Sequence, residues 1–329
     1  MNITATLLAT LLVGSSATWG ALALWYQAPG GLAAKIVYVA LWAAFSTAVL
    51  IGLWLGQFAL GLLSFAAVLG GLLLWWHRLL PSNDRLWADD VSQMTSGTVD
   101  GNRVTLRNVR NFTWHTRTEY ATLWETRCYD LARLNAIDMI VSYWSRRTIA
   151  HMLFSFGFDD GDQVAFSVEI RRETHESYSE IGGFFKQFEL SVIAADERDI
   201  VHLRTNVRRE DVYLYRVRMP IPAMRSLFLA YINEANSLVR APRFYHTVTG
   251  NCTTLVYQLM KRIIGPLPFD YRVLLSGYMP EYVYRIGGLD RRYSLEELRA
   301  LGRISERGIK AGRSETFSAD IRQGVPPLG

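Results

Sequence analysis

Residues 251–263 read NCTTLVYQLMKRI, a polar start followed by an apolar pattern. The apolar residues recur at helical spacing, which predicts a helix from Cys252 to about Ile264. Thr249 or Asn251 can cap this helix, so Cys252 falls in its first turn. Most lone cysteines are buried core residues. A thiol at a helix N-terminus has a lowered pKa, however, and only the thiolate is a nucleophile, so Cys252 is a candidate catalytic residue.

Earlier in the chain, two runs with the composition of β-strands flank the turn sequence Asp159-Asp160-Gly161-Asp162. The runs are residues 151–158 and 163–171, and together with the turn they predict a hairpin. His151 opens the first strand and is a candidate base for Cys252. Residues paired across an antiparallel hairpin lie on the same side of the sheet, so the turn determines which residue faces His151.

Three residues of the second strand compete for the place beside His151. A turn centred on its second residue puts Glu169 there, and one centred on its third puts Arg171 there. Ser167 is the competitor if the register slips. A carboxylate in this place would fix the imidazole tautomer and leave the other ring nitrogen for the thiol, as in a Cys-His-acid triad. The charged end of this strand is also compatible with an ordinary solvated surface.

The remaining polar and sulfur-containing candidates are few. Asn251 is a possible side-chain donor to an oxyanion, and the backbone N–H of Cys252 is a second donor that follows from the helix start. Cys128, the other cysteine, is interpreted as a core residue. Two cysteines lack metal-ligand spacing and are too few for a disulfide framework, although counting leaves one Cys128–Cys252 disulfide open. We expect no metal and no cofactor.

The N-terminal part of the chain is almost uncharged. Its length and composition predict three transmembrane helices, with interfacial aromatic residues near their ends. A cleaved signal peptide is the alternative for the first helix, but that segment lacks a basic start and its apolar stretch is long. The few lysines and arginines flanking the helices do not orient them. The predicted spans are about Ile3–Trp25, Ala34–Leu53 and Gln57–Trp76.

Beyond Pro81 the charge density becomes ordinary and the periodicity mixed, which predicts an α+β domain with an antiparallel sheet. Residues 119–134 are more helical in pattern, and residues 200–204 predict a strand. The net charge of +5 is small and the basic residues are interspersed with acidic ones, so no nucleic-acid partner is expected. The predicted organisation is a membrane domain at 1–80, a linker at 81–102, a catalytic domain at 103–300 and a loosely ordered tail at 301–329.

Five motifs, in order along the chain, resemble the Lnb N-terminal periplasmic domain family. They are HMLFSFGFDDG, FSVEIRRE, the Tyr178-Ser179 pair, FELSVIAADERDIVHLR and PRFYHTVTGNCTTLVYQL, and the resemblance covers about Val104 to Leu289. It implies a permuted papain-like (NlpC/P60-like) domain in which His precedes Cys, related to the lecithin:retinol acyltransferase group. Cys252 would then be the nucleophile and His151 the base, with weaker support for Glu169. Arg171 and Tyr178 are further candidates to contact the substrate. His246 stands where the family pattern has Asn.

The resemblance also implies a bacterial inner-membrane protein whose soluble domain faces the periplasm. The expected activity is acyl transfer from a membrane phospholipid to an amine such as a lipoprotein N-terminus, through a thioester on Cys252. A hydrophobic groove beside Cys252 is expected from several phenylalanines. A cysteine peptidase or amidase acting on cell-wall peptides is the second hypothesis, and a non-enzymatic envelope binding module the third. The groove candidates are Phe154, Phe156, Phe184, Phe185 and Phe188.

Overall fold

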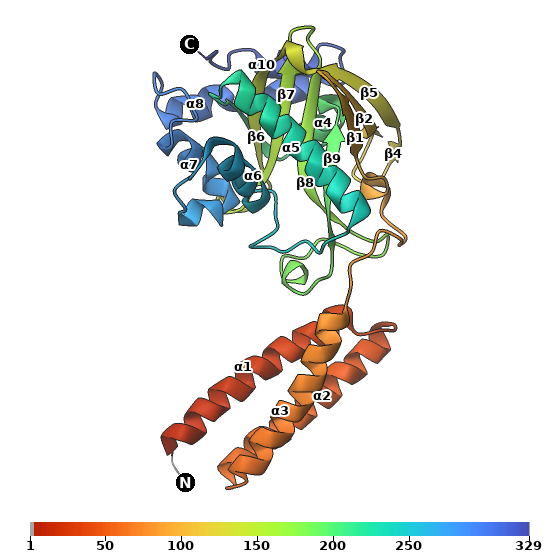
Figure 1. Cartoon of the computed structure of the whole chain (residues 1–329), viewed down its shortest axis with the longest axis vertical. Coiled ribbons are helices and arrows are strands. Elements are labelled where there is room, and N and C mark those ends of the chain that lie inside the picture. Colours follow the sequence, from red (N-terminus) through yellow and green to blue (C-terminus); the bar gives the residue numbers. More distant parts are fainter. Residues whose placement is uncertain (1–2, 329) are drawn as a thin grey trace. The chain divides into compact units, whose positions relative to one another are not determined.

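The structure is a computed structural model that describes residues 3–328 and separates into two compact units (Figure 1). The first, called the membrane unit here, comprises the chain up to Ser82 together with Tyr178–Gln187. The second, called the sheet unit, comprises Asn83–Ser177 and the chain from Phe188 onward. The predicted boundary near residue 80 is therefore close to the observed one, but the inclusion of residues 178–187 in the membrane unit was not predicted.

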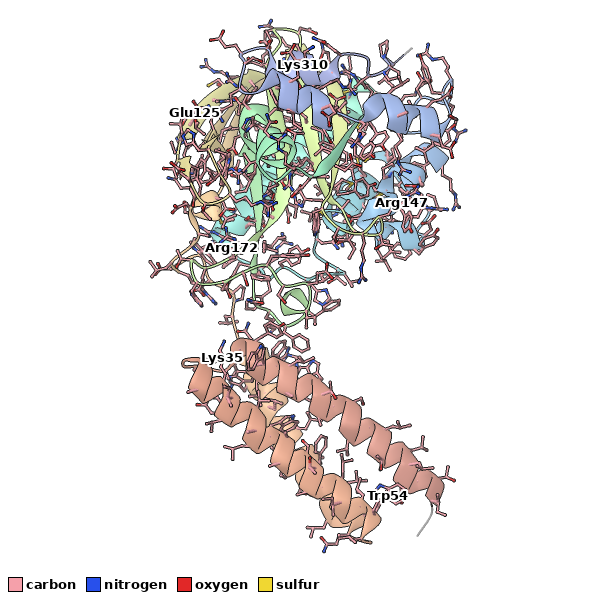
Figure 2. The ribbon with its side chains drawn as sticks, turned by 180° about the vertical axis from the view of Figure 1, so that it is seen from behind. Lys35, Trp54, Glu125, Arg147, Arg172 and Lys310 are labelled. Atoms are coloured by element: carbon pink, nitrogen blue, oxygen red, sulfur yellow. The ribbon has the colours of Figure 1, made fainter. Side chains whose placement is uncertain are left out.

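Three helices in the described part of the chain are long and apolar enough to cross a membrane. α1 and α2 each contain one predicted span and extend it by a few residues, and α3 begins one residue after the start of the third predicted span and ends two residues beyond it. α2 packs against both neighbours, and Trp42 on α2 donates its indole N–H to the carbonyl of Ala17 on α1, at 2.8 Å. A Cβ at Gly20 would lie 2.6 Å from the Trp42 ring, so this helix contact requires glycine there. Figure 2 shows Lys35 and Trp54 at opposite ends of α2. The helices are α1 (Ile3–Gln27), α2 (Leu32–Trp54) and α3 (Phe58–Arg78).

The sheet unit is built on a mixed sheet with strand order β1-β2-β9-β8-β7-β6-β10, in which β5 also pairs with β2. The pairs are antiparallel, as predicted, except that β2 and β9 pair in parallel. The fold is therefore α+β. The strands are β1 (Ser96–Asp100), β2 (Arg103–Arg110), β5 (Trp124–Asp130), β6 (Leu134–Tyr143), β7 (His151–Phe158), β8 (Gln163–Arg171), β9 (Glu189–Ala195) and β10 (Asp211–Arg216), with a small separate pair, β3 (Thr113–Trp114) and β4 (Tyr120–Ala121).

Helices cover both faces of this sheet, and each layer has its own apolar core. α5 crosses one face (Figure 1) and packs there with α6, α7 and α8. α4, a π-helical turn and the two last helices cover the other face. The first layer consists of α5 (Ile221–Arg240), α6 (Thr254–Ile264), α7 (Met279–Arg285) and α8 (Leu295–Gly302). The second consists of α4 (Glu197–His202), the π-helix η4 (Leu203–Val207), α9 (Ser305–Ala311) and α10 (Phe317–Arg322). Short 3-10 helices occur at Asp89–Val91, Leu131–Arg133, Gly182–Phe184, Tyr271–Val273 and Ser276–Tyr278.

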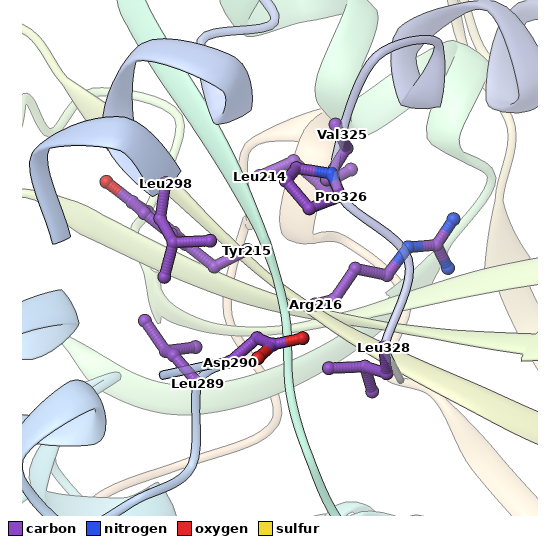
Figure 3. A pocket seen from close by; sticks show the side chains of 9 residues that line it. All are labelled: Leu214, Tyr215, Arg216, Leu289, Asp290, Leu298, Val325, Pro326 and Leu328. Carbon is purple, nitrogen blue, oxygen red and sulfur yellow. The ribbon is translucent and has the colours of Figure 1, made fainter. Parts of the chain in front are cut away.

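The C-terminal tail is packed, so the prediction of a loosely ordered segment from 301 was wrong. Phe317 and Ile321 are fully buried in the second core. Arg322 follows them and forms ion pairs with two buried carboxylates, those of Asp138 and Glu197. The tail's apolar residues are divided between two short helices, too short to show a helical period in the sequence. The last residues line a small pocket with β10 and α8 (Figure 3): Val325, Pro326 and Leu328 with Leu214 and Leu298.

Two further sequence expectations were wrong in the sheet unit. Residues 119–134 form β4, β5 and a 3-10 turn instead of a helix, because β5 pairs with β2 along its length. Residues 200–204 continue α4 into the π-helix instead of forming a strand. Asp196 caps α4 by accepting the N–H of Arg198, at 2.8 Å. The expected linker 81–102 contains β1 and belongs to the sheet unit from Asn83 onward.

The packed tail leads to a prediction about stability. Phe317→Ala would leave a cavity in the second core and lower the free energy of unfolding by about 3–5 kcal/mol. Leu301→Ala, at an exposed position of α8, is the matched control and should change it by less than about 0.5 kcal/mol. Urea unfolding of the detergent-purified protein, followed by tryptophan fluorescence, measures both. Equal stability of the two variants would mean that the tail does not contribute to the core.

Candidate active site

Cys252 lies at the capped N-terminus of α6. The N–H of Leu255 donates to the carbonyl of Asn251, at 3.1 Å, so helical hydrogen bonding starts at Asn251 although regular helix begins at Thr254. The side-chain oxygen of Asn251 accepts the N–H groups of Thr253 and Thr254, at 2.9 and 2.8 Å. Asn251, and not Thr249, is therefore the cap, and Cys252 is the first residue of the first turn.

The capping role also accounts for the side-chain amide of Asn251. Its nitrogen donates to the carbonyl of Thr247, at 2.6 Å, and the residue is buried. Both ends of this amide are thus engaged in holding the loop and the helix start. The backbone N–H of Cys252 differs, since no acceptor for it occurs among residues 3–328. Of the two oxyanion donors considered from the sequence, the backbone N–H is the one that the geometry leaves available.

The register of the β7–β8 hairpin places His151 opposite Glu169. Leu153 pairs with Ser167, and the pairs continue in step to Gly157 and Gln163. This is the register of a turn centred on its second residue, and continued toward the start of β7 it brings His151 across from Glu169. The Nε2 atom of His151 lies 3.1 Å from a carboxylate oxygen of Glu169. Glu169, and not Arg171, is thus the residue facing the imidazole.

Ser167 is part of the same hydrogen-bonded group and is not an alternative to Glu169. Its hydroxyl lies 2.7 Å from Nε2 of His151 and donates to the Glu169 carboxylate at 2.6 Å. A hydroxyl that donates to the carboxylate can accept from the ring, so this network assigns a proton to Nε2 of His151. The other ring nitrogen, Nδ1, is then the one left to exchange a proton with a thiol.

The thiol and the imidazole interact, and each shifts the other's titration. Burial favours the neutral thiol of Cys252, which is only 8% exposed. Hydrogen bonding with His151 and the charge of that ring outweigh burial and hold the pKa of Cys252 below its ordinary value, with a contribution from the backbone N–H of Met152. Burial likewise lowers the pKa of His151, but the Glu169 carboxylate and the thiol raise it above its ordinary value. Both shifts act in the direction of a thiolate beside an imidazolium.

A second layer of buried charge supports Glu169. Arg204, in the π-helix, lies 3.5 Å from the Glu169 carboxylate and 3.3 Å from that of Glu210. Glu210 also accepts a hydrogen bond from Ser142. Burial raises the pKa of Glu169, but the charges of His151 and Arg204 together bring it well below the ordinary range. Neither Arg204 nor Glu210 was predicted, because the sequence around each resembles an ordinary strand or surface turn.

Residues 120–277 match the model of the family described as the Lnb N-terminal periplasmic domain. The matched range contains the β7–β8 hairpin, Arg204, Glu210 and Cys252. The chain is therefore similar to this family over just under half of its length. The sheet unit, which contains nearly all of the matched residues, is called the Lnb domain below. No curated protein and no solved structure matches the chain at a significant level. With its three membrane-spanning helices, the chain is a membrane protein with a periplasmic domain.

Arg171 makes structural contacts within the Lnb domain and does not lie beside His151. Its guanidinium donates to the carbonyls of Val91 and Ser92, at 3.0 and 2.8 Å, and to the Asn83 side chain, at 3.0 Å. It also lies over the Trp87 ring, 4.4 Å from its centroid. These contacts fix the segment that enters the Lnb domain from the membrane unit against β8. The expectation that Arg171 contacts substrate therefore lacks geometric support.

The structure bears on several other sequence expectations. Tyr178 belongs to the membrane unit, and its place near the substrate stays a prediction. Cys128 is exposed on β5 instead of buried, and both cysteines are free, so they form no disulfide. Four of the five phenylalanines suggested for a groove beside Cys252 are buried and two belong to the membrane unit, so that groove stays a prediction. Phe154, Phe156, Phe185 and Phe188 are buried, Phe184 is exposed, and Phe184 and Phe185 belong to the membrane unit.

The Cys252–His151 interaction predicts the reactivity of the thiol. In a Cys128→Ser background, iodoacetamide should alkylate Cys252 at neutral pH, because the lowered pKa keeps it as thiolate. His151→Gln removes the partner that lowers this pKa, so the thiol should behave as an ordinary one, which is only a few per cent thiolate at neutral pH. We expect the alkylation rate at pH 7 to fall at least about tenfold. Equal rates in the two proteins would contradict the assigned interaction.

Proposed function

We propose that this chain is a membrane-anchored thiol acyltransferase that transfers an acyl chain from a phospholipid to an amine, such as the N-terminus of a lipoprotein. The observation that carries the proposal is the position of the Cys252 thiol. Cys252 stands at a capped helix N-terminus beside an imidazole that Ser167 and Glu169 orient. The membrane-spanning helices support a lipid substrate, because they keep the protein in the bilayer where phospholipids and lipoproteins reside.

The fold and location are part of the same proposal. A histidine at the start of a strand, followed later in the chain by a cysteine at the start of a helix, is the arrangement expected of a permuted papain-like, NlpC/P60-like domain. Three spans would carry the chain from a cytoplasmic N-terminus across the bacterial inner membrane. The Lnb domain would then face the periplasm, in agreement with its family description.

In the first half-reaction, the Cys252 thiolate attacks the carbonyl carbon of a phospholipid ester. The resulting oxyanion accepts the backbone N–H of Cys252. The His151 imidazolium donates its proton to the leaving alcohol oxygen as the C–O bond breaks, which leaves a thioester on Cys252 and a neutral imidazole. Glu169 keeps its charge throughout and holds the ring in place.

In the second half-reaction, the acceptor amine attacks the thioester carbonyl. The neutral His151 takes the proton that the amine loses, and the C–S bond breaks to release the Cys252 thiolate. The product is an amide, and the enzyme returns to the thiolate–imidazolium state. Cys252 is nearly buried. This burial favours an apolar acyl chain as the substrate over a polar peptide, because a peptide requires an open cleft.

The thioester is the species that tests the proposal. Protein purified from membranes should carry an acyl group on Cys252, visible by mass spectrometry and released by neutral hydroxylamine. Cys252→Ser should abolish this hydroxylamine-labile adduct, whereas Cys128→Ser, the matched control, should retain it. Lipid transfer that depends on Cys252 without such an adduct would contradict the mechanism. Cys252-dependent cleavage of cell-wall peptides, with no adduct, would identify a peptidase or amidase instead.

The roles of Glu169 and Ser167 are distinguishable by rate. Glu169→Gln removes the charge that stabilises the imidazolium, and the rate of thioester formation should fall by about a hundred- to ten-thousandfold. Ser167→Ala removes one hydrogen bond to a charged network, and we expect about a ten- to hundredfold loss. Single-turnover acylation by a fluorescent phospholipid measures both rates. A Glu169→Gln protein as fast as the unmodified one would rule out the proposed orienting role.

A further inference from the structure

The connection between β8 and β9 contains a segment that packs with the membrane helices. Residues 178–187 belong to the membrane unit, although the strands on either side of them belong to the Lnb domain. The segment contains a single 3-10 turn, Gly182–Phe184, and is otherwise irregular. Its sequence, YSEIGGFFKQ, combines large apolar residues with one acidic and one basic residue. Such a composition suits the boundary between water and lipid better than either phase alone.

An aromatic contact joins the segment to the ends of two membrane helices. The Phe185 ring stacks on Tyr26, with centroids 5.7 Å apart, and meets Trp76 edge to face at 6.2 Å. Tyr26 is near the end of α1 and Trp76 near the end of α3. Tryptophan and tyrosine at the ends of spans mark the headgroup region of a bilayer. Phe185 therefore extends an interfacial aromatic belt with a residue from outside the spans.

Polar contacts hold the backbone of the segment at the same level. The Gln27 side-chain amide donates to the carbonyls of Phe185 and Lys186, at 3.1 and 2.8 Å. The Lys186 ammonium donates to the carbonyl of Trp76, at 2.7 Å, at the C-terminal end of α3. The Tyr26 hydroxyl lies 3.2 Å from that of Ser179. These contacts satisfy backbone groups of an irregular segment, which the hydrocarbon core would not tolerate unpaired.

Two large apolar side chains of the segment remain exposed. Ile181 is 52% exposed and Phe184 is 44% exposed. Ile181 precedes the 3-10 turn and Phe184 is its last residue, and the turn is fixed by a hydrogen bond from the N–H of Gly182 to the Ser179 hydroxyl, at 2.9 Å. Trp25 and Leu80, near the ends of α1 and α3, are exposed as well. Exposed apolar residues next to the ends of membrane spans contact lipid more readily than water.

We propose that residues 178–187 form a membrane-interfacial loop whose Ile181 and Phe184 side chains insert among phospholipids at the headgroup boundary. The occupant is lipid because the segment is fixed to the ends of bilayer-spanning helices, at the level of their aromatic belt. Lys186 and Glu180 keep the loop at the polar boundary, so it does not enter the hydrocarbon core. This inference concerns the membrane unit alone and stands whether or not Cys252 carries an acyl group.

Site-directed spin labelling tests the inference on the full chain. Single cysteines at Ile181 and Phe184, in a Cys128→Ser/Cys252→Ser background, are labelled with a nitroxide and reconstituted into phosphatidylethanolamine–phosphatidylglycerol vesicles. Oxygen concentrates in lipid and a polar nickel chelate in water, so their relative effects on the label report its surroundings. We expect labels at both sites to collide more often with oxygen than with nickel.

Two control positions calibrate the result. Leu63, on α3 and 71% exposed, is the lipid-facing reference, and Leu123, just before β5 and 48% exposed, is the water-facing one. Labels at 181 and 184 that behave like one at Leu123 would overturn the proposal. A lipid-like pattern that persists when the protein is diluted with excess phospholipid supports it. A pattern that disappears on dilution would show that a second copy of the chain covers the loop, and would also overturn it.

Discussion

The hydrogen bonds of Ser167 and Glu169 to one nitrogen of His151 are the interaction on which the proposed chemistry depends. They exist because the β7–β8 hairpin has a single register. A shift by one residue would move the side chains of β8 to the opposite face and replace the carboxylate by an apolar neighbour. The same bonds direct the second ring nitrogen toward a thiol and raise the affinity of the imidazole for a proton. The helix cap at Asn251 supplies the other half, because it fixes Cys252 in the turn that leads into α6.

Charge buried behind this site has an energetic cost that the network reduces. A carboxylate removed from water would normally take up a proton, and Glu169 avoids this because cations lie on two sides of it. Arg204 is itself balanced by Glu210, so the second layer is an alternation of opposite charges. π-helical turns are rare and often occur at functional sites, and here the π-helix carries Arg204. Glu169 would therefore stay ionised through the proposed reaction, in which its neighbour His151 gains and loses a proton.

The parts of this account that the sequence could predict are those with a local signal. Two long uncharged stretches predict the spans, the Asp-Asp-Gly-Asp turn predicts the hairpin and limits the residues that can face His151 to a few, and an Asn-Cys pair before an apolar period predicts the capped helix. The rest depends on contacts between distant residues. Arg204 reaches Glu169 only because a π-helix folds under β8, Cys128 is exposed because β5 lies away from the centre of the sheet, and the tail gains order from Asp138 and Glu197. Residues 178–187 show no sequence periodicity that would predict their place in the membrane unit.

The central claim is that Cys252 exists as a thiolate beside a protonated His151. The ultraviolet absorbance of the thiolate measures this state directly, as the difference between Cys128→Ser protein and Cys128→Ser/Cys252→Ser protein across a pH titration. The account predicts that the thiolate signal is still present at neutral pH, below the ordinary pKa of a thiol. The signal should be lost only when the pH is lowered further. A signal that appears only above pH about 8.5, where an unperturbed cysteine ionises, would contradict it.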